Sequence, residues 1–232
     1  MKKIIFLLKS NSSIYIFLSF FKHKIMNIFI KRKIIKLKKQ HQFLLKDKKI
    51  TNNFFSAHAY NFFYYLKKFK SNFDYLEIGS YEGNSAIFVA NTFENSNIYC
   101  VDNWVSTEEY IDHGNFSNIE KNFDYNISYY KNITKLKKSS NEFFVNNNKM
   151  FDAIYIDGHH LASQVYKDCV NAWTCLRDNG FLICDDYTWS FYPSLNDNPC
   201  FAINKFLGKI KGQYKLEKVS NSQIFIKKLI WN

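Results

Sequence analysis

Four side chains that can bind a cation or move a proton follow two apolar segments of the chain. Asp157 and the pair Asp185-Asp186 each come directly after such a segment, and His160 lies three residues beyond Asp157. If both segments are parallel strands, their carboxyl ends meet at one edge of a sheet, where ligands bind in open α/β folds. Converging carboxylates repel one another unless a cation is present, and hard oxygen ligands suit Mg²⁺ or Mn²⁺. The spacing predicts a metal site of Asp157, Asp185 and Asp186, with His160 as the general base.

Simpler roles for the same residues stay open. Asp157 could cap the helix that follows it, and Asp185-Asp186 could belong to a turn. His160 could be structural or could contact the acceptor, and we expect His159 to point away from the site. The three aromatic residues beyond the acid pair either wall an acceptor pocket or pack in the ordinary way: Tyr187, Trp189 and Tyr192.

A second group of candidates surrounds a pair of glycines. Glu77-Ile78-Gly79-Ser80-Tyr81-Glu82-Gly83 follows a predicted strand and precedes a predicted helix. Gly79 permits a tight turn close to a ligand, and Gly83 lets the helix begin near it. Asp102 closes the next strand, where an acid can bind the hydroxyl pair of a ribose. The pattern predicts a nucleotide site, although a structural turn in another α/β fold would use the same residues.

Alternating strand and helix patterns must position both groups. Strands are expected at 74–79, 97–102, 151–157 and 181–184, helices at 24–46, 55–70, 85–93 and 161–176, and a turn at 178–180. The segments 214–219 and 223–228 predict a final antiparallel hairpin. Because strands joined through helices pair in parallel, the fold class is α/β, with a mostly parallel central sheet and helices on both faces.

These motifs resemble those of a known enzyme family. The loop Glu77-x-Gly79-x-x-x-Gly83 is similar to motif I of class I methyltransferases, although Tyr81 stands where a middle glycine is common. Ile-Asp-Gly-x-His at 156–160, then Leu-x-x-x-Gly and a strand ending in Asp-Asp, resembles methyltransferase domain family 24, of the macrocin O-methyltransferase type. The resemblance covers about residues 55–228 and implies a Rossmann-like class I methyltransferase fold.

The resemblance also implies ligands and roles. S-adenosylmethionine would be the cofactor, bound through Glu77 and the loop residues Gly79, Ser80 and Gly83, which would line its methionine part. Asp102 would take the ribose, and Ser139-Ser140 would lie near adenine. Asp157, Asp185 and Asp186 would hold Mg²⁺ or Mn²⁺, and His160 would be the base. The expected reaction is methylation of a hydroxyl on a small, sugar- or polyol-like acceptor.

The positive charge lies almost entirely in the first fifth of the chain. Of the 32 Lys and Arg and 20 Asp and Glu, residues 1–50 hold 14 bases and one acid, which leaves 18 and 19 for the remainder. The domain itself is therefore nearly neutral, and no nucleic-acid partner is expected. We expect residues 1–50 to be a basic helical extension and 51–232 to be the methyltransferase domain. A basic amphipathic helix either packs on its domain or lies on an anionic membrane, so peripheral contact at the inner membrane face is an alternative.

Cellular location and rival functions follow from what the pattern lacks. Five cysteines without a Cys-x-x-Cys pair suit reduced thiols, and neither N-terminal apolar run is a convincing signal sequence, so we expect a cytoplasmic protein. A dinucleotide oxidoreductase is disfavoured by the missing third glycine, and an amine methyltransferase by the absence of an Asn/Asp-Pro-Pro motif. The alternatives left open are a non-catalytic or membrane-recruited cofactor-binding protein and a methyltransferase for another class of acceptor.

Overall fold

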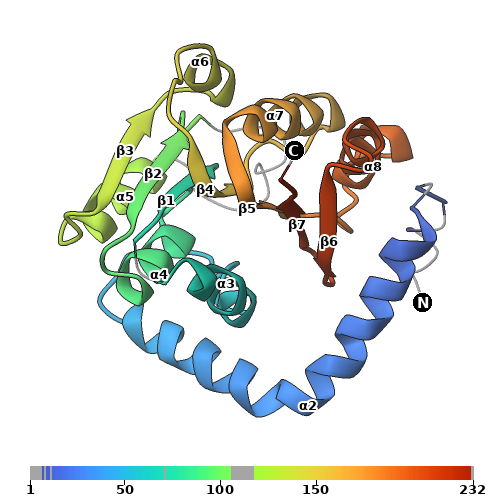
Figure 1. The fold of residues 1–232 in the computed structure, drawn as a ribbon. Helices are drawn as coiled ribbons and strands as arrows, with labels where there is room; N and C mark the ends of the chain where they lie inside the picture. Colours follow the sequence, from blue (N-terminus) through green and yellow to red (C-terminus); the bar gives the residue numbers. More distant parts are fainter. Residues whose placement is uncertain (1–6, 8, 11, 71, 106–117, 231–232) are drawn as a thin grey trace. The chain divides into compact units, whose positions relative to one another are not determined.

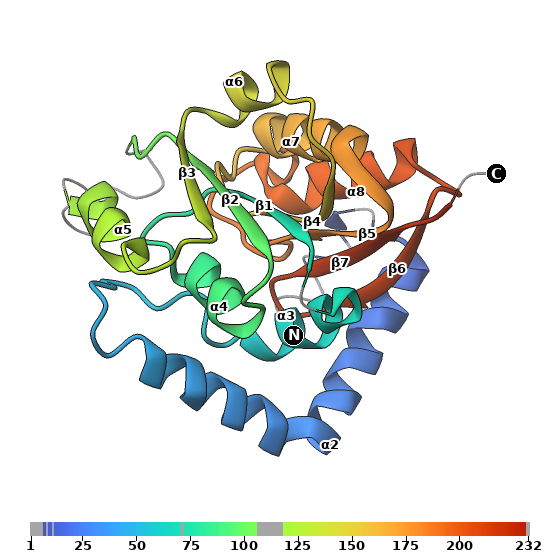
Figure 2. The same cartoon turned by 60° about the vertical axis from the view of Figure 1, so that its left-hand side comes forward.

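A computed structural model describes residues 7, 9–10, 12–70, 72–105 and 118–230 (Figures 1 and 2). Seven strands form one sheet in the order β3-β2-β1-β4-β5-β7-β6. The pairs β1–β2, β2–β3 and β4–β5 are parallel, whereas β7 pairs antiparallel with both β5 and β6. This confirms the predicted α/β fold class and its C-terminal hairpin. The chain divides into two compact units, residues 27–143 and residues 1–26 together with 144–232.

The unit of residues 27–143 contains three parallel strands and the helices that pack on them. Its strands are β1 (Asp74–Ile78), β2 (Asn97–Asp102) and β3 (Ile133–Lys137). Its helices are α3 (Ala59–Leu66), the 3-10 turn η1 (Lys67–Phe69), α4 (Asn84–Thr92) and α5 (Ile119–Ile127). The short helix α6 (Ser140–Val145) begins in this unit. Fully buried aliphatic side chains from β1, β2 and α4 form the core: Leu76, Ile87, Val89 and Ile98.

The second unit contains the other four strands. They are β4 (Phe151–Ile156), β5 (Leu176–Cys184), β6 (Tyr214–Val219) and β7 (Ile224–Lys228), with α7 (Ala162–Cys175), the 3-10 turn η4 (Leu195–Asp197) and α8 (Pro199–Lys209). The strands β4, β5 and β7 are buried over most of their length, as near-continuous apolar runs predict, whereas β6 is buried only at its end.

The turn predicted at 178–180 is an irregularity inside β5. Phe151 pairs with Leu176 but Ala153 pairs with Phe181. Residues 177–180 of β5 therefore lie opposite the single residue Asp152 of β4 and form a bulge. Asn179 has a left-handed φ of 62°. A Cβ at Gly180 would lie 2.7 Å from the carbonyl oxygen of Arg177 and 2.8 Å from that of Asp152, so only glycine fits there.

Most of the described N-terminal arm lies in one long helix, α2 (Ile14–Leu44), of 31 residues. It begins ten residues before the predicted helix at 24–46. Its first part is packed within its own unit: Phe20 is fully buried, and Ser19 Oγ accepts the backbone N–H of Val219 at 3.0 Å. Among the described residues, no helix is long and apolar enough to cross a membrane. Residues 1–6, 8 and 11 of the predicted extension lie outside the described residues.

Candidate active site

The glycine loop after β1 is a tight turn held by its own backbone. Gly79 and Gly83 have left-handed φ angles of 85° and 80°, and Tyr81 between them has 48°. The N–H of Gly79 donates to Val101 O at 2.9 Å, and that of Gly83 to Ser80 O at 2.7 Å. A Cβ at Gly83 would lie 3.1 Å from the Phe123 ring of α5, so packing as well as φ requires glycine there.

Asp102, at the end of β2, binds this loop directly. Its Oδ2 accepts the backbone N–H of Ser80 at 2.9 Å and of Tyr81 at 3.0 Å, and its Oδ1 accepts that of Trp104 at 2.7 Å. Burial raises the pKa of Asp102, and these three hydrogen bonds oppose that rise by stabilising the anion. Since a carboxylate offers about four lone pairs, one can still accept a hydrogen bond from a ribose hydroxyl. The Asp102 carboxylate therefore fits the expected cofactor as a hydrogen-bond acceptor, and the loop already fixes its orientation.

Glu77 lies behind the loop and is fully buried. Tyr75 donates its hydroxyl to Glu77 Oε2 at 2.9 Å, and the nearby hydroxyls of Ser85 and Ser80 also favour the charged form of this carboxyl group. Burial outweighs these effects and raises the pKa of Glu77 to about 7. The arrangement makes Glu77 a support of the loop, and its direct contact with a cofactor stays a prediction.

Ser139 and Ser140 follow β3, next to the end of β2. The backbone N–H of Lys138 donates to Asp102 O at 3.1 Å, which places the start of α6 beside the loop region of the same unit. Ser139 forms a capping box with Glu142: Ser139 Oγ accepts the N–H of Glu142 at 3.2 Å, and the Glu142 carboxylate accepts the N–H of Ser139 at 2.8 Å. The hydroxyl of Ser139 thus has a structural role, and its contact with adenine stays a prediction.

Sequence reasoning missed two further residues that hold the loop. Trp104 donates its Nε1–H to Tyr81 O at 2.8 Å, and its ring lies 4.8 Å from that of Phe123. Glu82 is fully buried and accepts hydrogen bonds from the Thr51 N–H at 2.6 Å and Asn122 Nδ2 at 2.8 Å. The position of Glu82 inside the glycine motif could have marked it as a candidate. Its hydrogen-bond partners, however, are 31 and 40 residues away in sequence, so its role could not be predicted.

The acidic group lies in the other unit, where β4 and β5 end in register at Ile156 and Cys184. One ligand atom each from Asp157, His160 and Asp186 lies within 4.8 Å of the other two. His160 Nε2 is 2.9 Å from Asp186 Oδ2. Ligands on one Mg²⁺ or Mn²⁺ lie about 2.1 Å from the ion and therefore at most about 4.2 Å apart, so a small inward shift of these side chains lets them share one cation. Two carboxylates and an imidazole fit such an ion in ligand type as well.

Asp185 lies outside that group of three and supports it. Its Oδ2 accepts Gln223 Nε2 at 2.7 Å, and its Oδ1 accepts the N–H of Asp186 at 2.8 Å. The Tyr155 hydroxyl contacts Asp185 Oδ2 and also Asp157 Oδ2, the latter at 2.8 Å. These contacts make Asp185 a positioning residue for Asp157 and Asp186, and its role as a metal ligand stays a prediction.

The neighbouring carboxylates shift the pKa of Asp157. Its burial, with the charges of Asp185 and Asp186, raises the pKa of Asp157 well above its ordinary value. One phenolic proton cannot serve two carboxylates at once, and a proton on Asp157 would satisfy the second contact with Tyr155. A divalent cation would supply the same compensation by positive charge.

The simpler roles considered for these residues are met only in part. No side chain caps α7, so Asp157 does not act as a helix cap; His159 Nδ1 instead accepts the N–H of Leu161 at 3.0 Å. Asp186 does lie in a turn, with a φ of 53° and its carbonyl accepting the N–H of Trp189.

The three aromatic candidates divide between core and site. The Trp189 ring lies 4.7 Å from that of His160 and forms ring contacts with Tyr192 at 6.2 Å. Tyr187 is fully buried, and its hydroxyl donates to Asn204 Oδ1 at 2.7 Å, so it packs in the interior. Only Trp189 and Tyr192 are therefore placed to wall an acceptor pocket.

Comparison with known proteins agrees with this geometry. A family model of a methyltransferase domain matches residues 76–187, which include both the glycine loop and the acidic group. No curated protein matches the chain. Residues 76–187 thus match a methyltransferase domain of this family, and the protein is an S-adenosylmethionine-dependent methyltransferase. Solved methyltransferase structures share its Rossmann-like class I fold.

Solved structures show the same fold at low identity. A putative caffeoyl-CoA O-methyltransferase from Staphylococcus aureus is 15% identical, with a TM-score of 0.56 over 90% of this chain and 99% of that one. The O-methyltransferase TomG from Streptomyces achromogenes, solved with S-adenosylmethionine, is 11% identical, with a TM-score of 0.57 over 85% and 89%. The methyltransferase MycE from the mycinamycin biosynthetic pathway, solved with Mg, SAH and mycinamycin VI, is 14% identical, with a TM-score of 0.58 over 84% of this chain and 54% of MycE.

Proposed function

We propose that this enzyme transfers a methyl group from S-adenosylmethionine to a hydroxyl of a small sugar- or polyol-like acceptor, assisted by a divalent cation. The observation that carries the proposal is the close approach of Asp157, His160 and Asp186 beside two strand ends. The presence of Mg in MycE supports the same chemistry for this site. When bound, S-adenosylmethionine supplies an electrophilic methyl group together with its own leaving group.

The chain's own residues would position the reactants and remove one proton. The loop from Gly79 to Gly83 would hold the methionine part of the cofactor through its backbone, and Asp102 would accept a ribose hydroxyl. His160 would accept the acceptor hydroxyl's proton, and Asp186, 2.9 Å from its Nε2, would orient the imidazole and stabilise it once protonated. Trp189, packed against that ring, would exclude water from one side.

Asp157 and Asp186 would hold Mg²⁺ or Mn²⁺, with Asp185 and Tyr155 fixing their orientation. Such an ion would supply positive charge that lowers the pKa of an acceptor hydroxyl beside it, which would ease the removal of the proton by His160. An acceptor with two neighbouring hydroxyls would suit the ion, because Mg²⁺ prefers several oxygen ligands. This preference is the reason for favouring a sugar or polyol acceptor over an amine.

Titration of Mn²⁺ into the S-adenosylmethionine complex tests the metal site. We expect Asp157→Asn and Asp186→Asn to weaken Mn²⁺ binding at least tenfold, because each removes one anionic ligand. Asp197→Asn, which removes an exposed acid in η4, is the matched control and should leave binding unchanged. Equal binding in all three variants would refute the metal assignment while leaving cofactor binding intact.

We further propose that the basic α2 lets the enzyme work at a membrane surface. The positive charge and the exposed apolar side chains of the helix support this proposal. The groove beside the helix offers a place where one lipid could bind.

A further inference from the structure

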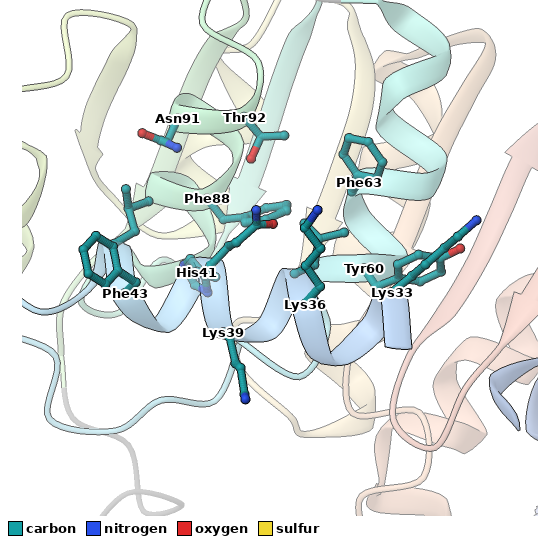
Figure 3. A pocket seen from close by; sticks show the side chains of 13 residues that line it. Lys33, Lys36, Lys39, His41, Phe43, Tyr60, Phe63, Phe88, Asn91 and Thr92 are labelled. Atoms are coloured by element: carbon teal, nitrogen blue, oxygen red, sulfur yellow. The ribbon is translucent and has the colours of Figure 1, made fainter. Parts of the chain in front are cut away.

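A groove of about 900 Å³ runs along the second half of α2, within the unit of residues 27–143 (Figure 3). Leu37 of α2, Phe63 of α3 and Phe88 of α4 give it mostly apolar walls. Its size lies within the range of ligand pockets in proteins. None of the residues placed at the glycine loop lines it, so it is distinct from the proposed cofactor site.

The charged side chains of the groove all have one sign. Lys33, Lys36 and Lys39 line it, and no Asp or Glu does. Among the described residues no carboxylate forms an ion pair with these three lysines. Figure 3 shows Lys36 rising from α2 between Phe88 and Phe63, with Lys33 beside Tyr60, whereas Lys39 points away. The lysines thus stand next to apolar walls, a combination that suits an anion with a hydrocarbon part.

The floor of the groove is uncharged. His41 is buried there, and Ser56 Oγ lies 2.9 Å from its Nδ1. Burial lowers the pKa of His41 to about 4, so its ring is neutral at physiological pH. Its ring packs edge-on against Phe88 at 5.3 Å and extends the apolar wall.

Apolar side chains next to the groove are exposed on the same stretch of α2. Ile28 is 73% exposed, Phe29 83% and Phe43 69%, between basic residues that include Arg32. The whole helix contains no Asp or Glu. A free phosphate would leave these apolar side chains in water, and a neutral acyl chain would leave the lysines without a partner. An anionic lipid uses both.

We propose that this groove binds one anionic phospholipid of a membrane surface, with its phosphate against Lys33 and Lys36 and an acyl chain along Leu37, Phe63 and Phe88. The exposed apolar side chains of α2 that lie near the membrane then enter the surrounding lipid interface, and the lysines and arginine between them meet anionic headgroups. The lipid proposal does not depend on the methyl-transfer chemistry, so the failure of one proposal would leave the other standing.

The test titrates the protein with monomeric dihexanoyl phosphatidylglycerol and, in parallel, with inorganic phosphate. We expect the lipid to bind, phosphate not to bind at the same concentration, and Lys33→Gln/Lys36→Gln to weaken lipid binding at least tenfold. The matched control Lys31→Gln/Lys38→Gln removes two charges from the same helix outside the groove and should stay within twofold. An equal loss of lipid binding in both double variants would show that the lipid is attracted by the overall charge of the helix. That result would overturn the proposed binding site in the groove.

A blocking variant tests the apolar half. Asn91 is exposed at the groove, so Asn91→Trp should fill it without disturbing the core and should weaken lipid binding with every lysine present. Flotation with phosphatidylglycerol vesicles should likewise depend on the groove, and neutral phosphatidylcholine vesicles should not bind. Binding of phosphate as tight as that of lipid, or of a single-stranded oligonucleotide more tightly than lipid, would overturn the proposal. Unchanged S-adenosylmethionine affinity in the variants establishes that they are folded.

Discussion

The glycine loop and the acidic group solve the problem of buried charge in different ways. Three backbone N–H groups of its own unit donate hydrogen bonds to the Asp102 carboxylate and stabilise its charge. The loop is therefore already held in place without a ligand. Asp157, Asp185 and Asp186 lie close together, and the groups that compensate them include a phenol, an amide, an imidazole and one backbone N–H. The glycine loop is therefore formed without a ligand, whereas the acidic group gains stability from a proton or a cation. Three predictions bear on that contrast.

The largest effect is expected at His160 in the acidic group. His160→Ala should lower the methyl-transfer rate by about 10²–10⁴-fold, the usual contribution of a general base. His159→Ala, which removes the bond that His159 Nδ1 accepts from the Leu161 N–H, should cost less than tenfold. Single-turnover kinetics with saturating S-adenosylmethionine measure both. If His160 is a metal ligand and not the base, its variant should instead regain activity at high Mn²⁺ concentration.

A smaller effect is expected at Gly83, and it should fall on folding. Gly83→Ala places a Cβ 3.1 Å from Phe123 at a φ of 80°, and strain plus overpacking should cost about 4 kcal/mol of unfolding free energy. Gly208→Ala is the control, because a Cβ there meets no atom within 4 Å and alanine favours the helix α8. Urea unfolding distinguishes them: the control should be slightly stabilised. Equal stabilities would mean that the loop is not a rigid, preformed element.

The smallest of the three effects concerns pH and Glu77. Folding raises the pKa of Glu77 to about 7, so the folded state binds its proton more tightly than the unfolded state does. The contribution of this proton to the free energy of unfolding is fully present below the ordinary pKa of about 4.5 and is lost as pH rises through 7. The change amounts to about 3 kcal/mol, because one pKa unit corresponds to about 1.4 kcal/mol.

Comparison with a neutral variant isolates that contribution. The difference in unfolding free energy between Glu77→Gln and the parent should shift in favour of the variant between pH 5 and pH 8. Chemical unfolding at several pH values measures it, and other titrating groups cancel in the difference. A pH-independent difference would show that Glu77 does not carry a raised pKa.

Local sequence patterns predicted the buried elements well. The segment 97–102 is β2 with the predicted bounds, and 151–157 and 214–219 agree with β4 and β6 to within one residue. Strands buried on both faces read as continuous apolar runs, which is a strong signal. β3 was missed for the opposite reason: it lies at the sheet edge, is only partly buried, and has lysines at alternate positions. The helices α5 and α8 were not predicted either.

The candidate site was predictable as far as its residues are close in sequence. Asp157 and His160 share one strand end, and the loop from Gly79 to Gly83 carries its own motif. Tyr155, Gln223 and Trp104 were missed, because their roles depend on partners brought close by folding. The separation of Asp185 from Asp157, His160 and Asp186 was equally invisible, since side-chain direction after a strand end is set by the turn and not by residue type.

The bulge in β5 bears on where the acid pair lies. Asp185 follows β5 directly, and its backbone N–H donates to Ile156 O of β4 at 2.9 Å, so sliding β5 against β4 would carry Asp185 and Asp186 away from Asp157. Any side chain larger than that of Gly180 would meet the carbonyls of Arg177 and Asp152, so the bulge keeps its shape only with glycine there. A glycine in the strand, five residues from the nearer aspartate and without any polar side chain of its own, thereby helps to set the distance between the acids of the two strands.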